Sequence, residues 1–335
     1  MFAKTDTWRL VIVLLLVLSF AFSLAGCGPE EPEVYHVGIL SGLSFIRDIT
    51  EGFKEGMAEL GYIEGENIVY DVQETEFDME VYRTILNGFV EDEVDLIVTF
   101  PTEATQEAKA ATEDTGIPVL FNFANIEGTG LVDSVREPGG NVTGVRYPGP
   151  DIALKRFEIM RELTPEADAM WVPYQRGYPI VESQLEVLEP AAEEAGVTLI
   201  EAPADNAAEI DSLLQEVVES GEVPFDAILF IAEPLTVTPD AFAVMAAFGA
   251  EHGIPVGGAL MSVDGYESVF GVNVDILEAG RDMAPMADKI LQGTPAGEIP
   301  VVSAENFIQI NYAVAEDLGL TVSESLLGQA DEVIR

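Results

Sequence analysis

Short apolar runs alternate with amphipathic stretches along the chain from Tyr35 onward, which is typical of strand–helix units built around parallel sheets. The apolar runs in the first part of the chain predict strands at 35–40, 67–72, 94–100 and 117–123. After Val145 the pattern begins again, with strands predicted at 169–173, 197–201, 227–232 and 254–259. A stretch at 269–274, a helical stretch at 277–291 and a further stretch at 307–310 follow as a tail.

Helices are predicted between these strands. Apolar residues fall at helical spacing from Ile46 to Leu60, and Gly61 stands where a left-handed residue ends a helix. Thr102 directly follows a predicted strand and precedes the helical run 103–115, so we expect it to be the N-cap of that helix.

Two similar series of strand–helix units predict an α/β protein with two lobes, each built on a parallel sheet. We find no long linker between the two series, so the lobes are expected to meet closely. The carboxyl ends of strands from both lobes then border a cleft, where ligands of such proteins bind.

The first 26 residues have a different pattern, with Lys4 and Arg9 ahead of a thirteen-residue apolar run at 10–22. That run is too short to span a bilayer and suits the apolar region of a signal peptide. The small residues before Cys27 resemble a bacterial lipobox, which implies cleavage before Cys27, lipidation of its thiol and a protein anchored outside the cytoplasm. Residues 27–33 are predicted to be a tether. The alternative is an ordinary signal peptide or membrane helix with an incidental cysteine.

Composition narrows the possible partners. The 335 residues include 15 basic and 60 acidic side chains, giving a formal net charge of −45, which would repel nucleic acid. Cys27 is the only cysteine, so the chain forms no intramolecular disulfide.

A family resemblance adds to this pattern. The segment GFKEGMAELGYIEGENI at 52–68 is similar to a motif of ABC-transporter substrate-binding proteins related to the tryptophan and tyrosine receptors. Shorter similar segments follow in family order, notably PGGNVTG at 138–144 and ILQG at 290–293. The resemblance implies a type I periplasmic-binding-protein fold, whose two Rossmann-like lobes are joined by a three-crossing hinge and close on a small ligand for delivery to a permease.

The lobe boundaries follow from combining the pattern with this resemblance. We expect crossings near Val145, Val269 and Pro300. Lobe one is then predicted to comprise 34–145 and 270–300, lobe two 146–269 and 301–322, and the C-terminal tail 323–335. We expect a monomer.

Two positions depart from the family pattern. The usual Asp-Pro after the fourth strand falls at Asn125-Ile126, and the Asp-Asn after a second-lobe strand falls at Glu233-Pro234. Thr102 matches the family's cleft threonine, and the helix start at that position suits a carboxylate.

Candidate ligand-binding residues lie in the loops that follow the predicted strands. Aromatic side chains recur there, which suits an aromatic or apolar ligand such as an amino acid, although core packing explains any single one equally well. The predicted ligand-binding residues are Ser41, Leu43, Ser44, Phe45, Pro101, Thr102, Phe123, Asn125, Tyr174, Arg176, Glu233 and Leu260.

Several of these residues have predicted roles toward an amino acid. Glu233 would bind the ammonium, Thr102 with its helix start the carboxylate, and the aromatic residues the side chain. Arg176 is a second carboxylate candidate, but it also suits a solvated arginine that balances nearby acids.

Catalytic and cofactor sites are not expected. The only histidines, His36 near a strand start and His252 near a helix end, do not supply a Ser-His-Asp triad or a multi-histidine metal site. We find no dinucleotide fingerprint and no P-loop, so no cofactor is predicted.

Three hypotheses about function remain. The first is a binding protein of an ABC importer with permease subunits as partners. The second is a membrane-tethered ligand sensor for a signalling partner. A secreted α/β enzyme is the third, and it would have to work without a usable histidine.

Overall fold

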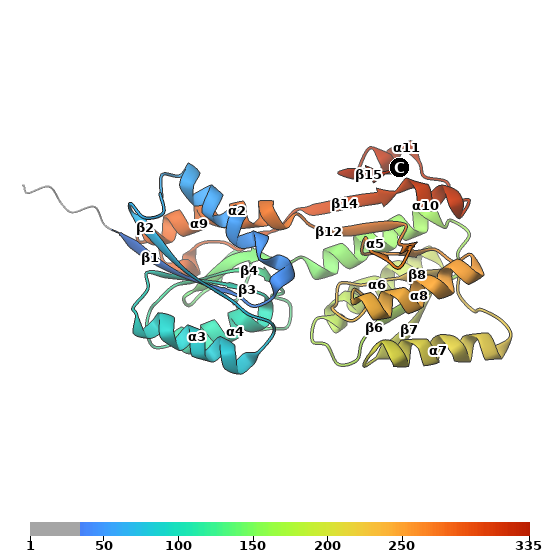
Figure 1. The fold of residues 1–335 in the computed structure, drawn as a ribbon, viewed down its shortest axis with the longest axis horizontal. Coiled ribbons are helices and arrows are strands. Elements are labelled where there is room, and N and C mark those ends of the chain that lie inside the picture. The colour runs from blue at the N-terminus through green and yellow to red at the C-terminus, as the bar shows by residue number, and fades with distance from the viewer. Residues whose placement is uncertain (1–33) are drawn as a thin grey trace, which may run out of the picture.

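The computed structural model describes residues 34–335, so the predicted signal peptide, the tether and Cys27 lie outside the described residues. Two α/β lobes lie side by side and are joined by long strands along one side (Figure 1). Sequence patterning therefore correctly predicted the fold class.

Lobe one is built on a six-stranded sheet in the order β13-β5-β4-β3-β1-β2, in which every neighbouring pair is parallel. Its strands are β1 (Tyr35–Ser41), β2 (Ile68–Glu74), β3 (Leu96–Phe100), β4 (Val119–Ala124), β5 (Val142–Arg146) and β13 (Val302–Ser303). Its helices are η1 (Ser44–Ile46), α2 (Asp48–Glu59), α3 (Met79–Glu91), α4 (Thr102–Thr112), α9 (Ile276–Leu291) and η2 (Ala296–Glu298).

Helices cover both faces of this sheet, with α2 and α9 on one face and α3 and α4 on the other (Figure 1). Alternate residues of β1 therefore belong to different cores: Val37 and Ile39 to the core that contains Phe53 of α2, and Leu40 to the core that contains Tyr82 of α3. This explains why the strand reads as a continuous apolar run. The two helices of the first face pack closely, since a Cβ on Gly52 would lie 2.0 Å from the carbonyl oxygen of Leu277.

Lobe two is built on a four-stranded parallel sheet in the order β7-β6-β8-β9. Its strands are β6 (Ala169–Gln175), β7 (Thr198–Ala204), β8 (Ala227–Leu229) and β9 (Val256–Gly257), with a small hairpin of β10 (Ser262–Val263) and β11 (Tyr266–Glu267). Its helices are α5 (Gly149–Leu163), α6 (Val181–Ala195), α7 (Ala207–Ser220) and α8 (Pro239–His252).

A third, three-stranded sheet lies along the side of lobe two (Figure 1). It consists of β12 (Phe270–Val274), β14 (Asn306–Asn311) and β15 (Glu332–Ile334), with β12 antiparallel and β15 parallel to β14. Two short helices, α10 (Tyr312–Asp317) and α11 (Glu324–Leu327), precede β15. Segment 323–335 thus contributes a helix and a strand.

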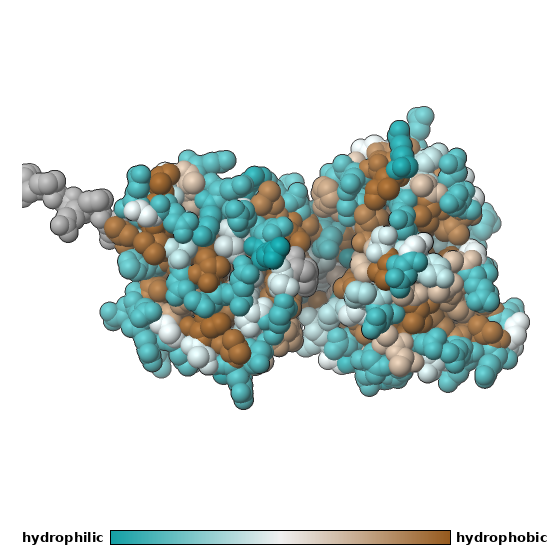
Figure 2. Space-filling model, viewed as in Figure 1, coloured by the Kyte–Doolittle hydropathy of each residue, from teal (hydrophilic) through white to brown (hydrophobic). Residues whose placement is uncertain are grey.

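The chain passes between the lobes three times. It leaves lobe one between β5 and α5, returns between β12 and α9, and leaves again between β13 and β14. Short connections at all three points hold the lobes next to each other, and the filled surface narrows between them (Figure 2).

Three local predictions need correction. Thr102 is the first helical residue of α4 and not its N-cap, because Pro101 takes the extended cap conformation. Strand β8 ends at Leu229 instead of residue 232, since the backbone of Ala232 bonds to the side chain of Gln184. Strand β9 stops at Gly257, because Gly258 has φ +124°, which breaks the strand conformation.

Candidate functional site

The two lobes meet at the carboxyl ends of their strands. In lobe one, α4 begins directly after β3, and Asn125 follows β4. In lobe two, Tyr178 follows β6, and Glu233 follows β8. The hydroxyl of Tyr178 lies close enough to the carboxylate of Glu103, the second residue of α4, for each group to influence the pKa of the other, so the two edges face each other. We call this region the strand-end interface.

Two predicted residues of lobe one are brought together there. The backbone N–H of Asn125 donates to Oγ1 of Thr102 over 3.0 Å, and both residues are buried. The Oδ1 atom of Asn125 has no hydrogen-bond partner among the described residues. That atom lies against the start of α5, since a Cβ on Gly149 would be 2.7 Å from it. Asn125 therefore touches both Thr102 and the first helix of lobe two.

An aromatic pair lies beside this contact. Phe123, near the end of β4, has φ +50°, and its ring centroid is 4.6 Å from that of Tyr147. Tyr147 lies in the first crossing and is buried, and burial raises the pKa of its hydroxyl. The pair supplies an apolar surface at the point where the chain enters lobe two.

Glu233 is 7% exposed and is fully engaged within lobe two. Its Oε2 accepts the backbone N–H groups of Gln175 at 3.0 Å and Leu235 at 2.8 Å. Its Oε1 accepts the N–H of Thr236 at 2.7 Å and the hydroxyl of the same residue at 2.6 Å. Four donors fill the positions that a carboxylate offers, so Glu233 fixes the loop between β8 and α8.

A buried cation lies within electrostatic reach of Glu233. Arg156 of α5 is 2% exposed and donates to the carbonyl oxygens of Val272 and Phe230 over distances of 2.8 to 3.2 Å. Burial lowers the pKa of its guanidinium, while Tyr147 and Glu233 oppose that shift. Arg156 thus connects β12, the strand that precedes the second crossing, to helix α5 of lobe two through hydrogen bonds. It also balances part of the charge of Glu233.

Glu103 has a different environment. Burial raises the pKa of its carboxyl, opposed by a hydrogen bond from its own backbone and by the hydroxyl of Tyr178. Its Oε2 is buried and has no hydrogen-bond partner among residues 34–335. Burial also raises the pKa of Tyr178, with the carboxylates of Glu103 and Glu233 as further causes. Tyr178 therefore lies under the influence of one acid from each lobe.

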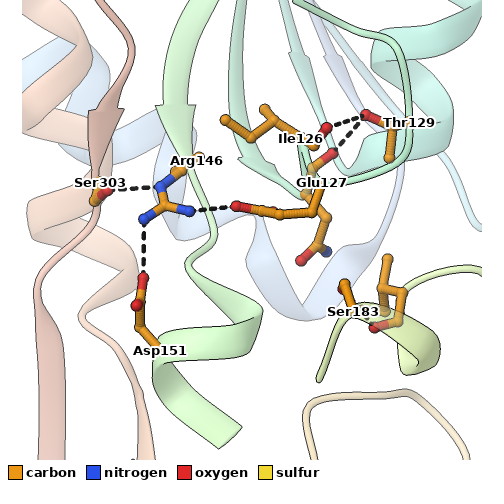
Figure 3. A network of polar contacts seen from close by, with 9 residues as sticks. Ile126, Glu127, Thr129, Arg146, Asp151, Ser183 and Ser303 are labelled. Atoms are coloured by element: carbon orange, nitrogen blue, oxygen red, sulfur yellow. Dashed lines mark hydrogen bonds and ion pairs between the residues drawn. The ribbon is translucent and has the colours of Figure 1, made fainter. Parts of the chain in front are cut away.

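A polar network connects the hinge to both lobes (Figure 3). Arg146, at the end of β5, binds Glu127 of lobe one, Asp151 of α5 at 2.8 Å, and the hydroxyl of Ser303 at 2.7 Å. The guanidinium thus bridges the first and third crossings. A cavity of about 420 Å³ lies beside this network, and its lining includes Glu127, Arg146, Asp151, Glu182 and Ser183.

The other predicted site residues are scattered. Tyr174 donates to Glu201 at 2.6 Å, and Arg176 pairs with Asp205 at 3.1 Å and with Glu209, so both are engaged with the β7 and α7 side of lobe two. Leu260 is half-buried beside Gly271 of β12.

Residues at the start of lobe one vary in exposure. Ser41 and Pro101 are buried, Leu43 is half-buried, and Ser44 is exposed. The side chain of Phe45 lies outside the described part of the chain.

Sequence reasoning missed Glu103, Tyr147, Arg146 and Arg156 as candidates. The sequence did contain an indication for Arg156, because this residue falls on the apolar face of α5 together with the buried Ile152, Phe157 and Met160. An arginine on an apolar helix face indicates a buried charge. Glu103 gave no such signal, because an acid in the first turn of a helix is already explained by the helix dipole.

Metal-binding groups and membrane-spanning helices are both absent from the described residues. Within 34–335 there is no group of three or more histidine, cysteine, aspartate or glutamate side chains placed to hold a metal ion. Nor does any helix of that range combine the length and apolarity that crossing a bilayer requires.

Known proteins resemble this chain over most of its length. A family model described as ABC transporter substrate binding protein matches residues 37–334. A curated tyrosine-binding protein of Clostridioides difficile (strain R20291) is 27% identical over 261 residues, covering 76% of this chain and 71% of that protein.

Solved structures show the same arrangement. An ABC domain from Streptococcus pneumonia in complex with L-Trp is 26% identical, with a TM-score of 0.74 over 90% of this chain and 100% of that one. A conserved domain protein from Vibrio cholerae is also 26% identical, with a TM-score of 0.72 over 90% and 99%. A ligand-free, open substrate-binding protein from Clostridium difficile is 23% identical, with a TM-score of 0.72 over 90% and 99%.

Proposed function

The chain belongs to the family of ABC transporter substrate-binding proteins, and from this we propose that it is a lipoprotein outside the cytoplasm that captures a small ligand for an importer. The observation that carries the proposal is the strand-end interface, where both lobes present polar and aromatic groups around a hinge with three crossings. A ligand held from both sides favours the closed arrangement of the lobes, and a permease can recognise that arrangement.

The proposed ligand is an aromatic or apolar amino acid. Two relatives support this, since one is a tyrosine-binding protein and another was solved with L-Trp. Phe123 and Tyr147 provide an apolar surface, and Thr102 stands beside them at the start of a helix. The hydroxyl of Thr102 accepts from Asn125 and keeps its own hydrogen to donate to a carboxylate. The other residues predicted from sequence stay part of the proposed site.

Uptake measurements test the importer role. We expect purified protein to bind L-tryptophan or L-tyrosine in calorimetry, and cells that lack the gene to take up less of the labelled amino acid. Restoring the gene should restore uptake. Normal uptake in the deletion strain, with binding intact in vitro, would instead indicate the tethered sensor.

Cys27 is proposed as the lipid anchor. Replacing Cys27 by Ala should move the protein from the membrane fraction to the soluble fraction, or leave it unprocessed, because no other thiol is present for lipidation. Membrane retention with normal processing of that variant would contradict the anchor.

A further inference from the structure

Glu103 is a half-buried acid, and one oxygen of its carboxylate is shielded from solvent without a hydrogen-bond donor in the part of the chain that the structure describes. Its Oε2 atom has no hydrogen-bond partner among the described residues, although it is shielded from solvent. An unpaired oxygen of a buried carboxylate is costly, because the atom has lost its water without gaining a donor. The side chain is thus poorly satisfied by this structure alone.

A counter-charge is missing as well. No arginine, lysine or histidine nitrogen of residues 34–335 lies within 4.0 Å of the Glu103 carboxylate. Its neighbour across the interface is the neutral hydroxyl of Tyr178, which influences the pKa of Glu103. A cation supplied by a ligand would therefore give the Glu103 carboxylate the counter-charge that the described residues do not provide.

Glu233 has no free acceptor for a cation. Four hydrogen bonds occupy its two oxygens, and Arg156 acts on its charge. A ligand ammonium at Glu233 would have to displace donors that hold the loop in place. The same ammonium at Glu103 would gain a free acceptor.

The position of Glu103 in the first turn of α4 does not by itself explain why an acid occurs there. An acid in the first turn is stabilised by the helix dipole when it is exposed. Here the residue is half-buried and its Oε2 is shielded from solvent, and burial is the largest influence on its pKa, raising it against the effect of the backbone N–H of Glu103. The position therefore costs stability, which is typical of residues retained for binding.

We propose that Glu103, and not Glu233, receives the positively charged nitrogen of the ligand, and that Tyr178 contacts the same group from the opposite lobe. This inference rests on the proposed function and adds a requirement, because the ligand must carry an ammonium group. The interface then discriminates amino acids from the corresponding acids without an amine. Closure brings the two contacts together, so the ammonium favours the closed lobes.

Calorimetry with matched ligands tests this inference. The detergent-solubilised full-length protein is titrated with L-tryptophan and L-tyrosine, and with their amine-free counterparts indole-3-propionate and 3-(4-hydroxyphenyl)propionate. Wild-type protein should bind the amino acids more tightly. In Glu103→Gln, affinity for the amino acids should fall roughly ten- to a hundredfold, while affinity for the amine-free acids is unchanged.

Two further variants serve as controls. Glu113→Gln removes the same charge at the exposed far end of the same helical segment and should bind all four compounds as wild type does. Glu233→Gln should affect amino acids and amine-free acids equally, since its role is to hold a loop. Melting temperatures of all variants show that each one is folded.

The outcomes separate the two proposals. If wild-type protein binds none of the four compounds, the proposed ligand class fails, and the ammonium assignment fails with it. If wild-type protein binds the amino acids but Glu103→Gln binds them equally well, only the assignment fails. Equal affinity of wild-type protein for a compound with and without its amine also overturns the assignment, whatever the variants do.

Discussion

The two lobes present the same residue type at comparable places, and the two side chains have different roles. Glu103 stands three residues after the end of β3, and Glu233 stands four residues after the end of β8. Both reach the strand-end interface, and both act on the hydroxyl of Tyr178. Glu233 has four hydrogen bonds, whereas one oxygen of Glu103 has none. Position after a strand thus brings an acid to the interface, but its hydrogen bonds decide whether it is available to a ligand.

This comparison predicts opposite effects on stability. Removing a well-bonded buried carboxylate leaves donors unsatisfied, while removing a poorly bonded one relieves a cost. Three substitutions test the contrast.

Replacing Glu233 by Ala should have the largest effect. The N–H groups of Gln175, Leu235 and Thr236 would lose their acceptor, and we expect the free energy of unfolding to fall by about 3 to 5 kcal/mol. Urea unfolding measures this, with the exposed Glu219→Ala of α7 as a control. A loss below about 1 kcal/mol would mean that water replaces the carboxylate at little cost.

Replacing Glu103 by Gln should stabilise the protein at neutral pH by roughly 1 kcal/mol, because a buried charge without a counter-ion is removed. Burial raises the pKa of Glu103 in the folded state, so the folded protein binds this proton more tightly than the unfolded chain does. Wild-type protein therefore recovers stability as the pH falls through that raised pKa, and the advantage of the variant should shrink there. Melting temperatures of both proteins between pH 4 and 8 give the difference. A lower melting temperature of the variant at pH 7 would show that Glu103 is already compensated.

Replacing Tyr178 by Phe should have the smallest effect on stability, a loss of about 1 kcal/mol or less, because the polar contact of its hydroxyl with Glu103 across the interface is removed. The lobes should then open further, which small-angle scattering detects as a larger radius of gyration. Tyr174→Phe is the matched control, since its hydroxyl bonds to Glu201 within lobe two. If both variants scatter alike, the contact between Tyr178 and Glu103 does not hold the lobes together.

Most of the fold was predictable from the sequence because both sheets are covered on two faces. Strands such as β3, buried along its whole length, read as uninterrupted apolar runs, and helices such as α3 carry apolar residues on one side. The errors fell at strand ends, where side chains replace backbone partners. Gln184 ends β8 in this way, and no local pattern reveals a partner that is 48 residues away.

The candidate site was less predictable for a similar reason. Thr102, Asn125 and Glu233 do follow strands β3, β4 and β8, and the structure brings Thr102 and Asn125 into contact. Whether a polar group is already satisfied depends on distant residues. Arg176 is occupied by two acids of the neighbouring strand and helix, and Glu103 stays unsatisfied, although both had the same type of position in the sequence.

Strand β15 has a consequence for how the protein is made. It pairs with β14, and β14 in turn pairs with β12, so this sheet requires the last residues of the chain. The six-stranded sheet is also completed late, because β13 at residues 302–303 pairs with β5 at 145–146. Many native contacts thus join residues that are far apart in sequence, and folds of this kind form slowly. A chain that lacks its C-terminal segment can finish neither sheet, so the fold is complete only when these last strands have paired.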